Sequence, residues 1–293
     1  MASPAAPLRH RAEAAAAALP PLLVAAERVA ATVAQGVHGR RRVGLGETFW
    51  QFRQYQPGDP AGRIDWRESA KTQRLFIREM EWEAAQSVFL WRDTSASMDY
   101  ASSAALPTKR ARADLLVLAL AALLLRGGER VTLLGSGLPP THGRAVLERM
   151  ALTLERGSEG DELPAFEPLP RFAHLVLVGD LLAPLEAIEA RVARFAARGL
   201  KGHLLQLLDP AEESLPFAGR VRFEGLEREA PVLISRVETV RDAYIEKLAR
   251  QRAGLAPLAR AAQWTFGTHR TDRPPHLALL ALHAALAPPP GRR

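Results

Sequence analysis

Two apolar runs that each end in an aspartate constrain the fold of this chain more than any other feature. Residues 87–92 are followed by Asp93, and residues 174–179 are followed by Asp180. Short apolar runs of this kind are typical of strands buried on both faces. Helix-like segments follow each run, and strands alternating with helices indicate a parallel sheet covered on both faces. We therefore expect an α/β fold with both aspartates at one edge of the sheet.

The same patterns divide the chain into four parts. We expect a helical extension over residues 1–35, a β-rich subdomain over 36–85, the α/β domain over 86–215, and a strand and helix extension over 216–293. Helices are expected over residues 9–35, 108–126, 143–156, 184–198, 237–262 and 276–287, with a break of the fifth at Gly254 or Pro257. Strands are expected over residues 48–55, 74–82, 87–92, 130–135, 174–179, 202–208, 220–226 and 264–267.

Composition narrows the function classes. The chain has no cysteine, which excludes disulfides, zinc–thiolate sites and cysteine nucleophiles. Its formal net charge of +7 makes a basic nucleic-acid-binding scaffold one alternative, although no long basic stripe is present. The apolar run 115–125 is too short to cross a bilayer and is expected to be a helix packed on both sides in the core. Without a membrane span or a signal pattern, we expect a cytoplasmic protein.

Oxygen-bearing side chains follow the first strand at alternate positions. Asp93, Ser95 and Ser97 supply one carboxylate and two hydroxyls, and Asp180 adds a second carboxylate from the neighbouring loop. Such oxygens are the ligands of a hard divalent cation, so we expect Mg²⁺, with Mn²⁺ or Ca²⁺ as alternatives. The other interpretation is that these side chains only cap the loop and the helices that follow.

A second motif lies in the β-rich region. It comprises Tyr55, Gly58, Asp59, Arg63, Asp65 and Trp66. Pro57 and Gly58 predict a tight turn, and Arg63 is expected to pair with Asp59 or Asp65. Tyr55 and Trp66 are expected to pack this subdomain onto the sheet. The motif is either a structural network whose polar groups bond one another or a surface that a protein partner binds.

Enzyme motifs are lacking. The chain has no G-x-S-x-G elbow and no G-x-x-x-x-G-K-[ST] loop, so neither an α/β-hydrolase triad nor P-loop nucleotide binding is expected. The eight histidines form no H-E-x-x-H cluster. A metal-dependent hydrolase or phosphatase that uses Asp93 and Asp180 remains the enzymatic alternative.

Taken together, two segments resemble a known bacterial family. The segment 46–71, with Tyr55-x-Pro-Gly-Asp and Arg63-Ile-Asp-Trp, and the segment Asp93-Thr-Ser-Ala-Ser-Met98 are similar in order and spacing to "domain of unknown function 58". The resemblance implies a von Willebrand A-like (Rossmann-like) fold with a metal-ion-dependent adhesion site, and an association with MoxR-type AAA+ ATPases. Such sites typically have a threonine in a third loop, for which Thr141 is the candidate.

The resemblance and the paired loops together predict a function. We expect a non-enzymatic, Mg²⁺-dependent adaptor that binds an acidic side chain of a protein partner. The partner would be a MoxR-type AAA+ ATPase that remodels or matures a client protein.

Overall fold

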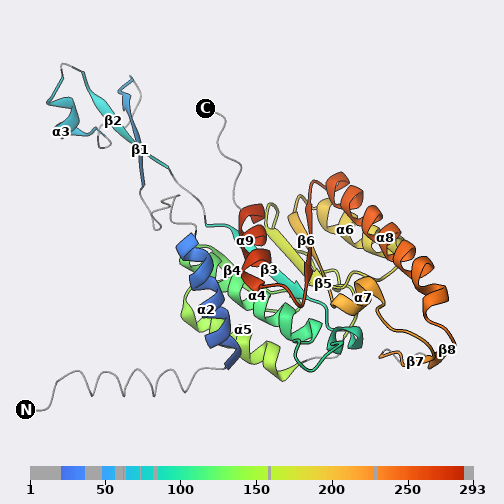
Figure 1. Ribbon diagram of the computed structural model, residues 1–293. Coiled ribbons are helices and arrows are strands. Elements are labelled where there is room, and N and C mark those ends of the chain that lie inside the picture. The colour runs from blue at the N-terminus through green and yellow to red at the C-terminus, as the bar shows by residue number, and fades with distance from the viewer. Residues whose placement is uncertain are drawn as a thin grey trace, which may run out of the picture.

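The computed structural model describes residues 21–36, 48–56, 62, 64–72, 74–81, 85–157, 160–226 and 230–286. Its centre is a five-stranded, all-parallel sheet with the strand order β4-β3-β5-β6-β9 (Figure 1). The strands are β3 (Ser87–Arg92), β4 (Arg130–Leu133), β5 (His174–Gly179), β6 (Lys201–Leu208) and β9 (Thr265–Arg270). The predicted α/β class, a mostly parallel sheet with helices on both faces and a small β-rich subdomain, is confirmed.

The alternation of side chains along β3 sends its apolar residues into two cores. Val88 and Leu90 belong to one buried cluster, whereas Phe89 and Trp91 belong to the other. Successive strand residues point to opposite faces, so a run that is apolar throughout can only be buried on both sides. This explains why the strand runs show no polar alternation in the sequence.

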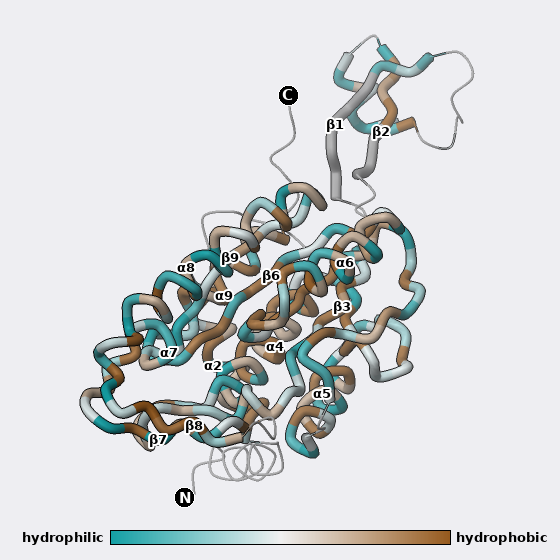
Figure 2. The backbone as a smooth tube through the Cα atoms, turned by 90° about the vertical axis from the view of Figure 1, so that its right-hand side faces the viewer, coloured by the Kyte–Doolittle hydropathy of each residue, from teal (hydrophilic) through white to brown (hydrophobic). Residues whose placement is uncertain are grey.

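One face of the sheet is covered by two layers of helices. The helices α4 (Lys109–Arg126), α5 (Arg144–Arg156) and α9 (Pro275–Leu286) lie on the sheet, with α4 in contact with both of the others, and α2 (Pro21–Gly36) packs across their outer side. Thr108 caps α4 by accepting a hydrogen bond from the Ala111 N–H. Figure 2 shows the hydrophobic colour concentrated along α4, β3 and β6. The prediction of a helix packed on both sides is thus confirmed.

The opposite face is covered by α6 (Leu185–Ala196) and α8 (Glu238–Ala261). The break expected in α8 at Gly254 or Pro257 is wrong, because the helix continues through both residues. Gly254 lies against Leu185, where an added Cβ would come within 2.4 Å of a leucine methyl carbon. The glycine therefore allows the two helices to approach closely instead of ending one of them.

Residues beyond 215 complete the main domain. The last strand, β9, pairs in parallel with β6, and α9 packs against α4, so the boundary expected at residue 215 does not separate two bodies. Between β6 and α8 lie a short helix, α7 (Pro210–Ser214), and a small antiparallel pair of strands, β7 (Val221–Phe223) and β8 (Val232–Ile234). Likewise α2, predicted as part of an extension, contributes Leu23 and Ala26 to the core around α4.

The β-rich subdomain is an antiparallel hairpin with one helical turn. Its strands are β1 (Thr48–Gln54) and β2 (Phe76–Glu81), and α3 (Trp66–Ser69) lies between them in the chain. In Figure 1 this unit stands away from the main sheet. Through the part of the chain that the structure describes, no helix combines the length and the apolar character needed to span a bilayer.

Candidate metal centre

The site forms where β3 and β5 end side by side. Arg92 pairs with Val178 in the register of these strands, and the Asp93 N–H continues the ladder by donating to the Val178 carbonyl at 2.8 Å. Asp93 therefore lies opposite Gly179, whose missing side chain leaves room for it. A Cβ at Gly179 would lie 2.7 Å from the Asp93 Cβ. The strand ends thus bring the two predicted loops into one crevice.

Four of the predicted ligands form a continuous chain of polar contacts. Asp93 Oδ1 accepts from the Ser95 N–H at 2.8 Å and from the Ser95 hydroxyl at 2.6 Å. The Ser95 and Ser97 hydroxyl oxygens are 3.0 Å apart, and Ser97 Oγ donates to Asp180 Oδ2 at 2.7 Å. A 3₁₀ turn, η2 (Ala96–Asp99), fixes the end of the loop. The structure therefore brings Asp93, Ser95, Ser97 and Asp180 together.

Asp93 carries one oxygen that the protein leaves unpaired. Its side chain is fully buried, and Oδ2 has no hydrogen-bond partner. Burial, followed by the nearby charge of Asp180, raises the pKa of Asp93 from 3.8 to about 7. A buried, unpaired carboxylate oxygen is costly to charge unless a proton or a cation neutralises it. The side chain is therefore poised to accept a cation near neutral pH.

Lys109, at the start of α4, is a site residue that our sequence analysis missed. Its ammonium is fully buried and contacts Asp180 Oδ2 at 2.9 Å and Glu212 Oε1 at 2.6 Å. Burial acts to lower the pKa of Lys109, but the two carboxylates outweigh it and raise that pKa above its ordinary value. A lysine in the first turn of an apolar helix is unfavourable to the helix dipole. This unusual position is the feature of the sequence that could have identified Lys109 as a site residue.

Glu212 is held in place by a capping box on α7. Asp209 caps the helix by accepting from the Ala211 N–H at 2.8 Å, while Glu212 Oε2 accepts from the Asp209 N–H at 2.8 Å. The second oxygen of Asp209 accepts from the Ser102 N–H at 3.0 Å. This arrangement fixes α7 against the loop that follows η2, and with it the second carboxylate that holds Lys109.

Arg110 clamps the loop from its exposed side. Its guanidinium donates to the Ser95 carbonyl at 3.2 Å and forms a two-pronged pair with Asp99, with contacts of 2.5 and 2.8 Å. Below the site, Gln206 Nε2 donates to the Asp180 carbonyl at 2.9 Å, and its amide oxygen accepts from Arg252. The polar loops are therefore held by side chains from α4, β6 and α8.

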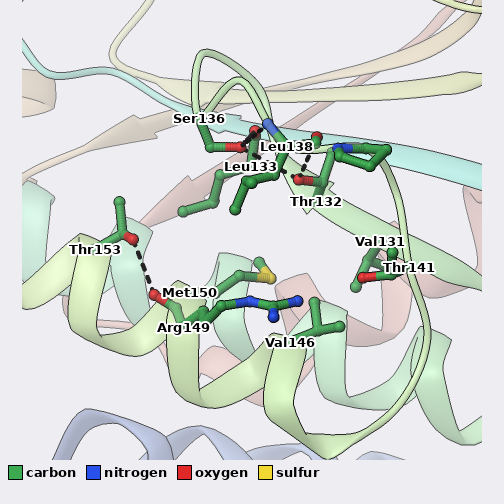
Figure 3. A pocket seen from close by; sticks show the side chains of 11 residues that line it. Val131, Thr132, Leu133, Ser136, Leu138, Thr141, Val146, Arg149, Met150 and Thr153 are labelled. Carbon is green, nitrogen blue, oxygen red and sulfur yellow. Dashed lines mark hydrogen bonds between the residues drawn. The ribbon is translucent and has the colours of Figure 1, made fainter.

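The structure does not bring Thr141 to this crevice. Thr141 forms an isolated bridge with Val131, whose partner in β3 is Val88. Five residues at about 3.3 Å each separate Val88 from Asp93, so Thr141 lies about 16 Å away along the strand direction. It lines a small pocket between β4 and α5 (Figure 3). Assigning it to the metal was wrong because the chain after β4 folds back beside that strand.

A different segment lies in the third-loop position. The Gly160 N–H donates to the Thr94 carbonyl at 3.3 Å, and the Thr94 hydroxyl donates to the Asp161 carbonyl at 3.4 Å. Gly160 lies so close that a Cβ there would come within 2.4 Å of Thr94 Oγ1. The segment after α5 thus borders the crevice.

The second motif is described only in part, since Gly58, Asp59 and Arg63 lie outside the described residues. Asp65 caps α3, accepting from the Glu68 N–H at 2.9 Å, and the Tyr55 N–H donates to the Leu75 carbonyl at 2.8 Å. The expectation that Trp66 packs the subdomain onto the sheet is wrong: its side chain is 65% exposed. The first position of α3 turns it outward.

The donor set fits a small, hard cation. No group of three or more His, Cys, Asp or Glu side chains with metal-site geometry occurs among the described residues. The crevice instead offers two carboxylates and two hydroxyls, with the unpaired Asp93 Oδ2 among them. Mg²⁺ prefers such oxygens and retains several waters, so a sparse set of protein ligands suits it.

These features define an α/β protein with a parallel sheet and an oxygen-rich crevice at the ends of two adjacent central strands. The family model described as "Protein of unknown function DUF58" matches residues 51–254. The chain belongs to this family, and the predicted resemblance is confirmed. The match includes both the hairpin subdomain and the crevice.

Relatives of similar length occur in mycobacteria. The chain is 29% identical over 249 residues to "Uncharacterized protein Rv1480" of Mycobacterium tuberculosis and to "Uncharacterized protein Mb1516" of Mycobacterium bovis. Each match covers 78% of this chain and 76% of the relative.

Two solved structures are also similar. One is an aerotolerance-related membrane protein from Bacteroides fragilis, with 16% identity, a TM-score of 0.41, and coverage of 69% of this chain and 98% of that protein. The other is the conserved hypothetical protein BatB from Bacteroides thetaiotaomicron, with 14% identity, a TM-score of 0.40, and coverage of 69% and 97%.

Proposed function

We propose that this protein is a non-enzymatic adaptor that uses Mg²⁺ to dock an acidic side chain of a protein partner. The observation that carries the proposal is the convergence of Asp93, Ser95, Ser97 and Asp180, with Asp93 Oδ2 buried and unpaired. Buried polar atoms are normally hydrogen-bonded, so the unpaired oxygen, together with the convergence of the four side chains, favours a bound cation over a purely structural network.

Each residue has a distinct role in this proposal. The hydroxyls of Ser95 and Ser97 and the free oxygen of Asp93 would hold the ion, and Asp180 would orient a water beside it. When bound, the ion supplies an open coordination position for an anionic ligand. Arg110 and Gln206 keep the two loops in place through backbone carbonyls of Ser95 and Asp180. The crevice is therefore organised before a partner arrives.

The proposed partner is a MoxR-type AAA+ ATPase that remodels or matures a client protein. The expectation comes from the family resemblance, and the exposed Trp66 on the projecting hairpin supports a second contact with such a partner. Large aromatic side chains are frequent at the energetic centres of protein interfaces. An ATP-driven partner works in the cytoplasm, so the proposal includes that location.

The test is capture of the purified cognate ATPase by this chain, with Mg²⁺ and with a chelator. We expect the chelator, or Asp93→Ala combined with Ser95→Ala, to reduce capture at least tenfold. The matched control is Ser235→Ala combined with Asp242→Ala, which changes the same residue types at exposed positions. Equal capture by the site variant and by wild type would refute metal-bridged docking.

Two further arms separate the alternatives. Trp66→Ala is expected to weaken capture without changing its sensitivity to chelator, because the hairpin is separate from the crevice. A panel of phosphoesters with added Mg²⁺ tests the hydrolase alternative. Turnover that disappears with Asp93→Asn would replace the adaptor proposal with an enzymatic one.

A further inference from the structure

One carboxylate oxygen in the crevice is shared by two donors. Asp180 Oδ2 accepts from Ser97 Oγ at 2.7 Å and from the Lys109 ammonium at 2.9 Å. The hydroxyl belongs to the candidate metal loop, whereas the ammonium comes from the core at the start of α4. A positive charge that belongs to the protein is therefore already bound to one of the two carboxylates assigned to the ion.

We propose that Lys109 is an internal cation that competes with the divalent ion for Asp180, and that Glu212 is the position to which its ammonium withdraws when the ion binds. This inference rests on the proposed function for the presence of the ion. It adds a positioning residue that sets how tightly and under which conditions the crevice binds Mg²⁺.

Geometry provides the withdrawal position. The Lys109 ammonium is already 2.6 Å from Glu212 Oε1, closer than its 2.9 Å distance to Asp180 Oδ2. Glu212 is fixed by its contact with the Asp209 N–H, and Asp180 Oδ1 accepts from the Leu182 N–H at 3.3 Å. Both carboxylates are thus held by backbone groups, and the four-carbon stem of the lysine is the part that can move.

Charge balance agrees with this competition. With Asp93, Asp180 and Glu212 ionised, three negative charges face one ammonium, which leaves a net charge of −2 that one divalent ion neutralises. If Lys109 were only a structural counter-ion, it would be expected to remain on Asp180. Because like charges repel strongly where solvent is excluded, an ammonium on Asp180 Oδ2 and an ion whose bound water is oriented by the same carboxylate cannot lie side by side without cost.

The consequence for docking is a conditional site. Displacing Lys109 from Asp180 consumes part of the binding free energy of the ion, so the crevice alone binds Mg²⁺ weakly. An acidic side chain from a partner brings one more negative charge and offsets the repulsion between the ion and the ammonium. The ion and the partner should therefore bind cooperatively, each increasing the affinity for the other.

The small number of lysines makes the direct test practical. The chain has four, Lys71, Lys109, Lys201 and Lys247, so a spectrum of ¹⁵N-labelled side-chain ammonium groups in the full-length protein contains few signals. The signal lost in Lys109→Arg identifies Lys109. We expect this signal, and not that of Lys201, to shift on titration with Mg²⁺ alone, with the same midpoint as the calorimetric binding curve.

Substitution provides the second measurement. Lys109→Met should increase the affinity for Mg²⁺ at least tenfold, whereas Lys201→Met, which removes an exposed charge, should change it less than twofold. If Lys109→Met does not fold, Glu212→Gln decides the question. It weakens the withdrawal position and removes a negative charge, so the affinity for Mg²⁺ should fall at least threefold.

The outcomes separate this inference from the proposed function. Mg²⁺ binding by wild type that leaves the Lys109 signal unmoved would overturn the inference and leave the adaptor proposal intact. If Lys109→Met binds Mg²⁺ and wild type does not, the competition is supported, but the proposal that the natural chain docks its partner through Mg²⁺ is refuted. An absence of binding in both proteins, or an unchanged affinity in either Lys109→Met or Glu212→Gln, would overturn the inference.

Discussion

Replacing Asp93 with asparagine is expected to stabilise the metal-free protein at alkaline pH. The asparagine oxygen can still accept from the Ser95 N–H and hydroxyl, which bond Asp93 Oδ1 at 2.8 and 2.6 Å. The substitution removes the buried charge, while its amide nitrogen replaces an oxygen that has no partner. The result therefore depends on the balance between the cost of the charge and the cost of an unpaired amide.

The magnitude follows from the pKa of Asp93. Because this carboxyl has a pKa of about 7 when folded and an ordinary value of 3.8, the folded protein binds its proton more tightly than the unfolded chain. The protonated carboxyl therefore favours the folded state, and this stabilisation is lost as pH rises from about 4 to about 7. By pH 8 the loss amounts to ~4 kcal/mol. An unpaired buried amide costs about 1–3 kcal/mol. Asp93→Asn should thus gain about 1–3 kcal/mol at pH 8.

The assay is urea unfolding of wild type and Asp93→Asn at pH 5 and pH 8, with chelator present. The difference in free energy of unfolding between the two proteins should grow by about 2–3 kcal/mol in favour of Asp93→Asn between these pH values. Asp242→Asn, on the exposed side of α8, is the matched control. A difference that does not change with pH would refute the assignment of Asp93 as a buried, poorly compensated charge.

Two further substitutions test the packing of the main domain. Gly202→Ala would place a Cβ 2.3 Å from the buried Trp264 ring, and we expect urea unfolding to show a destabilisation of about 1–3 kcal/mol. The control is Gly267→Ala, whose new Cβ would have its nearest atom at 3.4 Å and should change stability far less. Arg112→Met removes buried hydrogen bonds, including 2.8 Å to the Thr271 carbonyl, and should cost about 3 kcal/mol. Hydrogen exchange should then show faster opening of α9, and unchanged exchange there would contradict the assigned role of this arginine.

Much of the fold was predictable because the main strands and helices are long enough for their hydrophobic pattern to be recognised. The strands ending at Asp93 and Asp180 and the helix after Thr108 were expected almost at their observed bounds. The short elements α7 and η2 were missed, because one helical turn has too few residues for a period to emerge. Their local chemistry was nevertheless present: Asp209 and Glu212, three residues apart, form a capping box.

The candidate site was predictable only where the chain order determines spatial order. Asp93 and Asp180 were correctly expected in one crevice because parallel strands end at the same edge. Thr141 could not be placed in this way, since its position depends on a bridge to Val131 that no periodicity encodes. Lys109 was missed for a related reason: its ammonium is enclosed by Asp180, which follows β5, and by Glu212 on α7, and this is a tertiary effect.

The double covering of α4 has a mechanical consequence. A helix enclosed by the sheet on one side, by α2 on the other and by α5 and α9 at its flanks cannot slide along its axis without disrupting the core, so its first turn is held in a fixed position. A signal generated at the crevice would therefore leave through the surface segments that border it, such as η2, α7 and the segment at Gly160 and Asp161. A partner that distinguishes the metal-bound protein from the metal-free protein would make contact there.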